Sequence, residues 1–195
     1  SVSRDYVEFP STFQEDWTLN PKVLANMAKH YETGEQIPQE LLDKVMAAKN
    51  FNMGFDTLEY ISAALLDFEY HTLTSEEAQA IDDVNTYEQA ALVRNGVNVD
   101  AVPPRYRSTF FAHVFAGGYS AGYYAYMWSE ILAADAFAFV QEQGGLTRQM
   151  GDKYRKEILE VGNSRDLMES YKAFRGQEPD TSALLKRRGL KATVQ

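Results

Sequence analysis

The chain has 195 residues, enough for one domain with a hydrophobic core, and its 45% apolar and 24% charged residues are in the globular range. A formal net charge of −9 argues against nucleic acid and anionic membrane surfaces as partners, and no apolar run approaches the roughly 18 residues of a membrane span. The absence of cysteine excludes disulfides, thiol nucleophiles and zinc–thiolate sites, and is compatible with a reducing compartment.

The opening stretch RDYVEFPSTFQEDW, residues 4–17, places carboxylates and aromatic rings around one proline. Glu8 and Glu15 are seven residues apart, so on a helix they would lie close to one face, and Pro10 would interrupt the backbone hydrogen bonds between them. The pattern fits an acidic surface cap or one part of a metal site. The chain starts without methionine and without the apolar stretch of a signal peptide, so we expect a processed chain or a piece of a longer protein.

Helix signals then follow one another. Asn20 and Pro21 predict a helix start and Gly34 its end, and a second helix is expected from Pro38. The stretch 57–73 is expected to be a third helix. Its apolar stripe consists of Leu58, Ile61, Leu65 and Phe68.

The second half of the chain continues in the same way. Thr74 and Glu77 have the spacing of a capping box, and adjacent prolines at 103 and 104 mark the clearest break. The longest apolar-rich stretch follows at 108–143, and two more short helices are each closed by glycine. No useful segment alternates with period two, so we predict an all-α fold of many helices, with residues 1–195 forming a single helical region.

Three tyrosines stand out in the apolar-rich stretch. Tyr119, Tyr123 and Tyr126 fall at i, i+4 and i+7, which predicts that the three phenols share one helix face. Gly117 and Gly118 precede them and permit backbone conformations closed to other residues. A mobile Gly-rich segment that brings phenols to a cleft would suit hydrogen bonding to an oxyanion. The alternative is an aromatic stripe packed between helices.

The histidines and arginines leave alternatives open. The three histidines, His30, His71 and His113, include no pair with the spacing of a helical zinc site, and H-E-x-x-H is absent. His113 is either a core histidine or a hydrogen-bond donor in a cleft. Arg105 and Arg107 precede the tyrosines, where a guanidinium can bind a substrate's terminal carboxylate, cap a helix or pair with a surface acid.

Several stretches together resemble one family. They are RDYVEFPSTFQEDW, HYETG, FFAHVFAGGYSAGYYAYMWSE, GGLTRQMGDKYRKEILEVGNSRDL and FRGQEPD. In this order they are similar to the C-terminal part of bacterial peptidyl-dipeptidases, or dipeptidyl carboxypeptidases, in the thimet oligopeptidase family of zinc metallopeptidases. The stretch PPRYRSTFFAH looks closer to this branch than to oligopeptidase A. The resemblance implies the helical C-terminal portion of a zincin-type catalytic domain.

The resemblance also implies metal ligands. In this family two histidines of an H-E-x-x-H helix and a later glutamate bind zinc, and zinc-activated water attacks the scissile carbonyl. The matching glutamate is Glu8, and Asp5 and Glu15 are candidates for orienting the ligands. The H-E-x-x-H helix would precede residue 1, so the chain resembles a C-terminal fragment. Alone, it is expected to bind zinc poorly and to lack peptidase activity.

For substrate, His113, Tyr119 and Tyr126 match family positions that bind the peptide and stabilise the tetrahedral oxyanion, and Tyr123 is a lesser candidate. The expected partners are oligopeptide substrates and the missing N-terminal part, with self-association possible through an exposed apolar face. The resemblance and the lack of cysteine favour the cytoplasm. Two alternatives remain: an endopeptidase of the same family, and a non-catalytic helical module that binds peptides or proteins.

Overall fold

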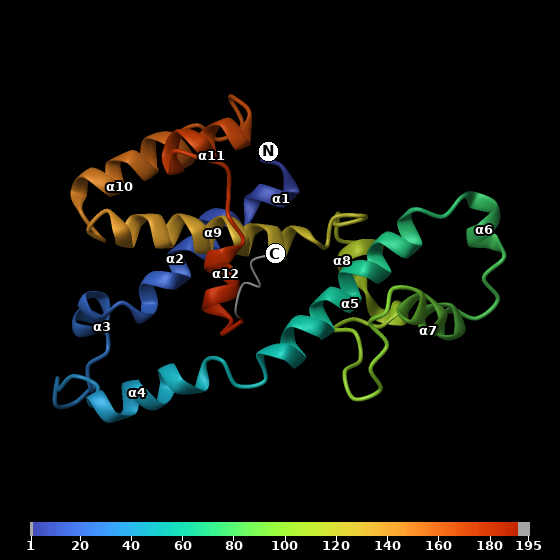
Figure 1. The fold of residues 1–195 in the computed structure, drawn as a ribbon, viewed down its shortest axis with the longest axis horizontal. Helices are drawn as coiled ribbons and strands as arrows, with labels where there is room; N and C mark the ends of the chain where they lie inside the picture. Colours follow the sequence, from blue (N-terminus) through green and yellow to red (C-terminus); the bar gives the residue numbers. More distant parts are fainter. Residues whose placement is uncertain (1, 191–195) are drawn as a thin grey trace. The chain divides into compact units, whose positions relative to one another are not determined.

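The computed structural model describes residues 2–190, and within that range its regular structure is entirely helical, which confirms the predicted all-α fold (Figure 1). No helix in this range is long and apolar enough to cross a membrane. The helices are α1 (Arg4–Val7), α2 (Phe9–Glu15), η1 (Asp16–Leu19), α3 (Pro21–Met27), α4 (Gln39–Ala48), α5 (Met53–His71), α6 (Ser75–Gln79), α7 (Val84–Arg94), η2 (Ser108–Phe110), α8 (Ala112–Phe115), α9 (Ala125–Glu142), α10 (Arg148–Tyr154), η3 (Arg155–Leu159), α11 (Leu167–Arg175) and α12 (Ser182–Arg187).

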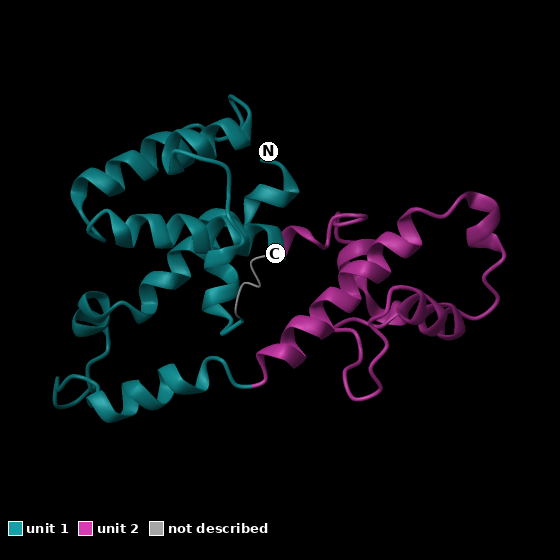
Figure 2. Cartoon of the chain, in the orientation of Figure 1, with its two compact units in different colours: residues 1–51, 127–195 teal, residues 52–126 magenta. Residues whose placement is uncertain are grey.

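The chain divides into two compact units (Figure 2). Unit 1 consists of Ser1–Phe51 and Met127–Gln195, and unit 2 consists of Asn52–Tyr126. The prediction of a single helical region over residues 1–195 remains a prediction, and residues 1 and 191–195 of it lie outside the described residues.

Unit 1 has an aromatic core to which α1 and α2 contribute. Phe9 is fully buried, with its ring centroid 5.6 Å from that of Tyr171, and Phe13 stacks on Tyr154 at 4.6 Å. Aromatic rings of this size supply much of the apolar area that stabilises a core. The aromatic residues of the opening stretch are therefore structural. The buried members of this core are Tyr6, Phe9, Phe13, Leu132, Ala133, Ala136, Val140, Tyr154, Ile158, Tyr171 and Phe174.

Unit 2 is organised on α5, its longest helix. Leu66 packs on Ala91 and Leu92 of α7 in a small apolar core. The helix also buries residues with polar groups: Tyr60 is 8% exposed and Asp67 is fully buried. The apolar stripe that the sequence suggested for this helix does not form the core, because its members are half-buried or exposed: Leu58, Ile61, Leu65 and Phe68.

Local capping signals are confirmed where the structure describes them. The side chain of Asn20 accepts a hydrogen bond from the N–H of Lys22 at 3.0 Å and starts α3. Thr74 and Glu77 form the reciprocal capping box, with the Thr74 N–H donating to Glu77 at 2.8 Å. The helix from Asn20 ends at α3's last residue, well before Gly34, which lies in a turn with φ +71°.

Candidate functional site

Residues 116–124 of unit 2, which we call the tyrosine segment, are irregular where the sequence predicted a helix. Residues 116–124 form turns between α8 and α9, so Tyr126 lies on a helix and Tyr119 and Tyr123 precede it. The prediction that the three phenols share one helix face is wrong. Gly118 and Ala121 have φ values of +80° and +52°, and left-handed residues cannot continue a right-handed helix.

The predicted side chains nevertheless lie together. The ring centroid of His113 lies 6.3 Å from Tyr119, 5.7 Å from Tyr123 and 6.3 Å from Tyr126. Tyr119 and Tyr126 stack at 5.1 Å. Tyr119 and Tyr123 are buried, whereas His113 and Tyr126 are half-buried and keep part of their surface open. We call His113, Tyr119, Tyr123 and Tyr126 the tyrosine cluster.

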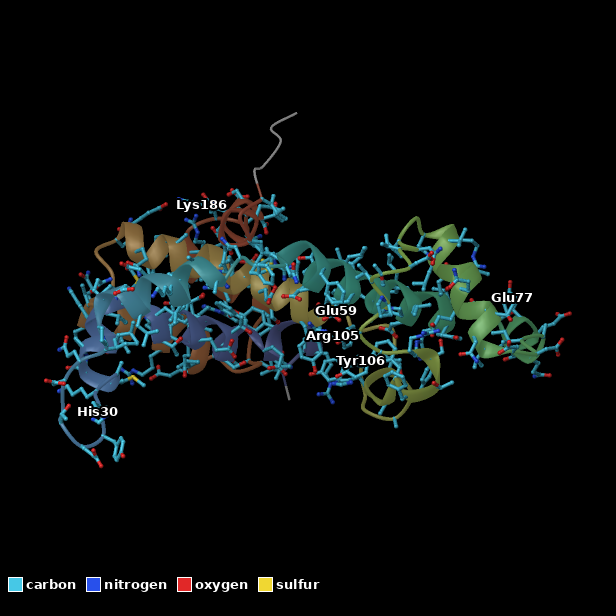
Figure 3. The ribbon with its side chains drawn as sticks, turned by 90° about the horizontal axis from the view of Figure 1, so that it is seen from below. His30, Glu59, Glu77, Arg105, Tyr106 and Lys186 are labelled. Atoms are coloured by element: carbon cyan, nitrogen blue, oxygen red, sulfur yellow. The ribbon has the colours of Figure 1, made fainter. Side chains whose placement is uncertain are left out.

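The sequence analysis missed one ring of this site. Tyr106 lies parallel to Phe111, with ring centroids 5.1 Å apart, and it is 4.8 Å from His113 and 5.9 Å from Tyr123. Figure 3 shows Tyr106 beside Arg105. The available signal was its place between two arginines just before the predicted site.

The two arginines are both paired with carboxylates. Arg105 donates from Nε and Nη2 to Glu59 Oε1 at 3.1 and 2.8 Å, and its backbone N–H donates to the Glu59 carbonyl at 2.9 Å (Figure 3). Arg107 pairs with Glu88, which is 1% exposed and also accepts from the N–H and hydroxyl of Ser108 at 2.7 Å. Both arginines therefore pair with an acidic side chain, which was one of the alternatives that the sequence left open. Their predicted role in binding substrate remains a prediction.

Electrostatics keep the central phenol protonated. Burial raises the pKa of Tyr123 to about 12, although the positive charge of Arg105 partly lowers it. For Arg105, burial lowers the pKa, but its hydrogen bond and attraction to Glu59 outweigh this and raise it overall. Near neutral pH the cluster therefore offers a neutral phenol beside a fixed cation.

The candidate metal ligand belongs to unit 1. Glu8 lies at the break between α1 and α2, with φ −86° and ψ −8°, and is half-buried. Ser11 donates its hydroxyl to the Glu8 carbonyl at 2.9 Å and to Oε2 at 3.2 Å. Asp5 is half-buried and accepts from the hydroxyl of Ser3, whereas Glu15 is exposed.

The donor set for a metal is incomplete within this chain. Among residues 2–190 no group of three His, Asp or Glu side chains is arranged to hold a metal ion. A half-buried carboxylate such as Glu8 suits a single ligand position, but one carboxylate does not fix a zinc ion. The residues present therefore do not fit zinc on their own.

A histidine and three phenols brought together by α8, the turns that follow it and the start of α9 are suited to holding a carbonyl group and polarising its oxygen. The chain belongs to Peptidase family M3, a family of metallopeptidases, which it matches over residues 1–190. This confirms the family that the sequence motifs resembled.

Individual relatives are similar along nearly the whole chain. Over 97% of its length the chain is 48% identical to dipeptidyl carboxypeptidase of Escherichia coli and 41% identical to oligopeptidase A of the same organism. It is 34% identical to saccharolysin of Saccharomyces cerevisiae, again over 97% of the chain. The chain spans 28% of the length of each bacterial relative and 26% of saccharolysin.

Proposed function

We propose that this chain is part of a longer zinc metallopeptidase that releases C-terminal dipeptides from oligopeptides. The observation that carries the proposal is the difference in identity between two relatives matched over the same 97% of the chain. Identity to dipeptidyl carboxypeptidase is 48%, against 41% to oligopeptidase A. The second value also supports a runner-up, an oligopeptidase that cuts peptides internally.

In this proposal the tyrosine cluster binds the peptide around the scissile carbonyl. Tyr119 and Tyr126 donate hydroxyl hydrogen bonds to the carbonyl oxygen as negative charge develops there. His113, half-buried against both rings, donates a further hydrogen bond to the substrate. Tyr123 lies deeper and supports the other rings, and its high pKa keeps its proton in place.

Arg105 and Arg107 are proposed to contact the negatively charged end of the peptide. Each arginine side chain is 44% exposed while paired with a glutamate, and a guanidinium has five N–H donors, more than its glutamate partner uses. The pairing fixes the direction of each cation, which favours recognition of one carboxylate geometry.

Glu8 is proposed to supply one carboxylate ligand to zinc, with Asp5 and Glu15 orienting it. The other ligands would be the two histidines of the H-E-x-x-H helix, outside this chain. The isolated chain is proposed to be inactive, and a cytoplasmic location is part of the same proposal.

The test is cleavage by the complete protein that carries this chain, with matched peptides that have free or amidated C-termini. A peptidyl-dipeptidase should release dipeptides from the free form and lose most of its rate on the amide. Equal cleavage of both would favour the oligopeptidase. Activity that survives a zinc chelator, or dipeptide release by the isolated chain, would contradict the proposal.

A further inference from the structure

Asp67 of α5 is a buried carboxylate, and burial of apolar surface cannot account for its position. It is fully buried, and a carboxylate away from water is costly unless hydrogen bonds satisfy it. Its donors are two backbone groups of the tyrosine segment: the N–H of Ala121 at 2.9 Å from Oδ1 and the N–H of Tyr123 at 2.8 Å from Oδ2. Nδ1 of His71 lies 2.8 Å from Oδ1.

The same helix holds Tyr123 a second time. The hydroxyl of Tyr60 donates to the Tyr123 carbonyl at 2.5 Å, and the two rings stack at 5.2 Å. Tyr60 and Asp67 are seven residues apart, about two helical turns, so they lie on one face of α5. Both backbone polar groups of Tyr123 are therefore bonded to side chains of one helix.

The tyrosine segment has an unfavourable backbone conformation that needs bonds to other parts of the chain to hold it. Ala121 has φ +52°, a left-handed conformation that is unfavourable for a residue other than glycine. Near its start, a Cβ on Gly117 would lie 2.9 Å from the His113 carbonyl, and the Tyr119 N–H donates to that carbonyl at 3.0 Å. The backbone from His113 to Tyr123 thus follows one tight path, fixed at its end by Asp67.

We propose that Asp67 is a positioning residue of the peptidase reaction: through the N–H groups of Ala121 and Tyr123 it holds the segment that carries the tyrosine cluster. This inference rests on the proposed function. Hydrogen-bond donors stabilise a developing oxyanion only when they are already in place. Asp67 touches neither substrate nor metal in this role, and it acts through the backbone.

The first test is amide hydrogen exchange on the chain itself, with Asp67→Asn. Asparagine keeps the shape of aspartate, but its NH₂ group turns one acceptor into a donor facing a backbone N–H. Exchange should rise by about tenfold or more at whichever of Ala121 and Tyr123 faces the new NH₂ group, and less at the other, which keeps a neutral acceptor. Tyr60→Phe leaves both Asp67 bonds in place and frees only the Tyr123 carbonyl, so it should produce a smaller rise at Tyr123. If Asp67→Asn does not fold, Asp67→Glu takes its place, because it keeps the charge but moves the carboxylate by one CH₂ group.

The second test is turnover by the complete protein with the same substitutions. Asp67→Asn should lower kcat by about 10- to 100-fold with KM changed less than about threefold, because misplaced donors weaken transition-state binding more than substrate binding. The matched control is Asp135→Asn in unit 1, a carboxylate 2% exposed that accepts from Tyr171 at 2.7 Å and from Arg175. It should leave kcat within about twofold, as expected for a buried carboxylate whose partners Tyr171 and Arg175 both belong to unit 1.

Unchanged exchange at both Ala121 and Tyr123 in the Asp67 variant that folds would overturn the proposal. Raised exchange with unchanged kcat would overturn it too, because Asp67 would then be structural only. An inactive complete wild-type protein would refute the proposed function instead, and the exchange experiment would still decide whether Asp67 positions the segment.

Discussion

The two units hold their candidate site residues by different physical means. In unit 1, Glu8 lies on a helix break whose neighbours Tyr6, Phe9 and Phe13 are buried in an aromatic core, so apolar packing sets its place. In unit 2, the tyrosine segment is fixed by hydrogen bonds to the buried carboxylate of Asp67. Packing tolerates small changes of shape, whereas a buried polar contact demands a matched partner.

This difference assigns different consequences to substitutions in the two units. Loss of an aromatic ring in unit 1 should be seen mainly as loss of folding free energy. Loss of a polar atom in the tyrosine segment should be seen mainly as loss of turnover, with the fold retained.

The largest effect is expected from Phe9→Ala in the isolated chain. Phe9 is fully buried, and truncating such a ring costs about 3–5 kcal/mol through lost transfer free energy and the cavity left behind. The free energy of unfolding, from urea titration followed by circular dichroism, measures it. The control Tyr31→Ala removes a ring that is 88% exposed and should change stability by less than about 0.5 kcal/mol. A loss below about 1 kcal/mol for Phe9→Ala would show that the core does not depend on it.

The next effect is expected from Tyr119→Phe in the complete protein. Removing one donor to an oxyanion lowers kcat by about 10²–10³-fold, and the ring that stacks on Tyr126 is kept. Steady-state kinetics on a dipeptide-releasing substrate measure it, with thermal unfolding as the check on folding. Tyr124→Phe is the control, since Tyr124 lies in the same segment but is 38% exposed and outside the cluster. Equal rates for the two variants would remove Tyr119 from the proposed oxyanion site.

Alkaline pH should destabilise the chain through its buried phenols. Burial raises the pKa of Tyr123 to about 12, and it also raises the pKa values of Tyr6, Tyr154 and Tyr171. Below the unfolded pKa of about 10 both states are protonated and stability is full. As pH rises from 10 towards 12 the unfolded chain ionises first, so stability falls, for Tyr123 alone by up to about 3 kcal/mol.

Tyr123→Phe should reduce the stability difference between pH 9 and pH 12, measured by urea unfolding with tyrosinate absorbance as a second signal. Tyr31→Phe, at an exposed position, should leave that difference as it is in the wild type. If both variants behave alike, the pKa of Tyr123 is not raised and its phenol is not buried in the folded chain.

The parts of the fold that depend on neighbours in sequence were predictable. Asn20 and the pair Thr74 and Glu77 cap helices as their spacing indicated, because capping involves residues two or three positions apart. The fold class followed from the same local signals. The predicted end of the first helix was wrong, since α3 ends at Met27 and Gly34 lies in a later turn.

The parts that depend on distant partners were not predictable. Asp67 accepts from the Ala121 N–H, 54 residues along the chain, and periodicity gives no sign of such a partner. Tyr119 and Tyr126 were grouped correctly from a helical spacing that does not exist, because the turn brings the rings together by another path. For Glu8 the residue pattern left a surface cap and part of a metal site both open, and the proposed ligand role rests on family resemblance, with no distance within this chain to indicate it.

The smallest effect is expected from Glu8→Ala in the isolated chain. Glu8 is half-buried at the break between α1 and α2, and the apolar rings beside it, not its carboxylate, form the core, so stability should fall by less than about 1 kcal/mol. Zinc per chain after dialysis against micromolar zinc should be near zero with or without Glu8, because one carboxylate cannot complete a tetrahedral site.

In the complete protein the same substitution should have a large effect, with bound zinc falling from about one per chain towards zero. Glu15→Ala is the matched control, since its exposed carboxylate is proposed only to orient the site and should weaken zinc binding by at most about 10–100-fold. One zinc per isolated chain, lost on Glu8→Ala, would contradict this account. It would mean that unit 1 builds a metal site from its own residues, and that Glu8 is held there by coordination as well as by packing.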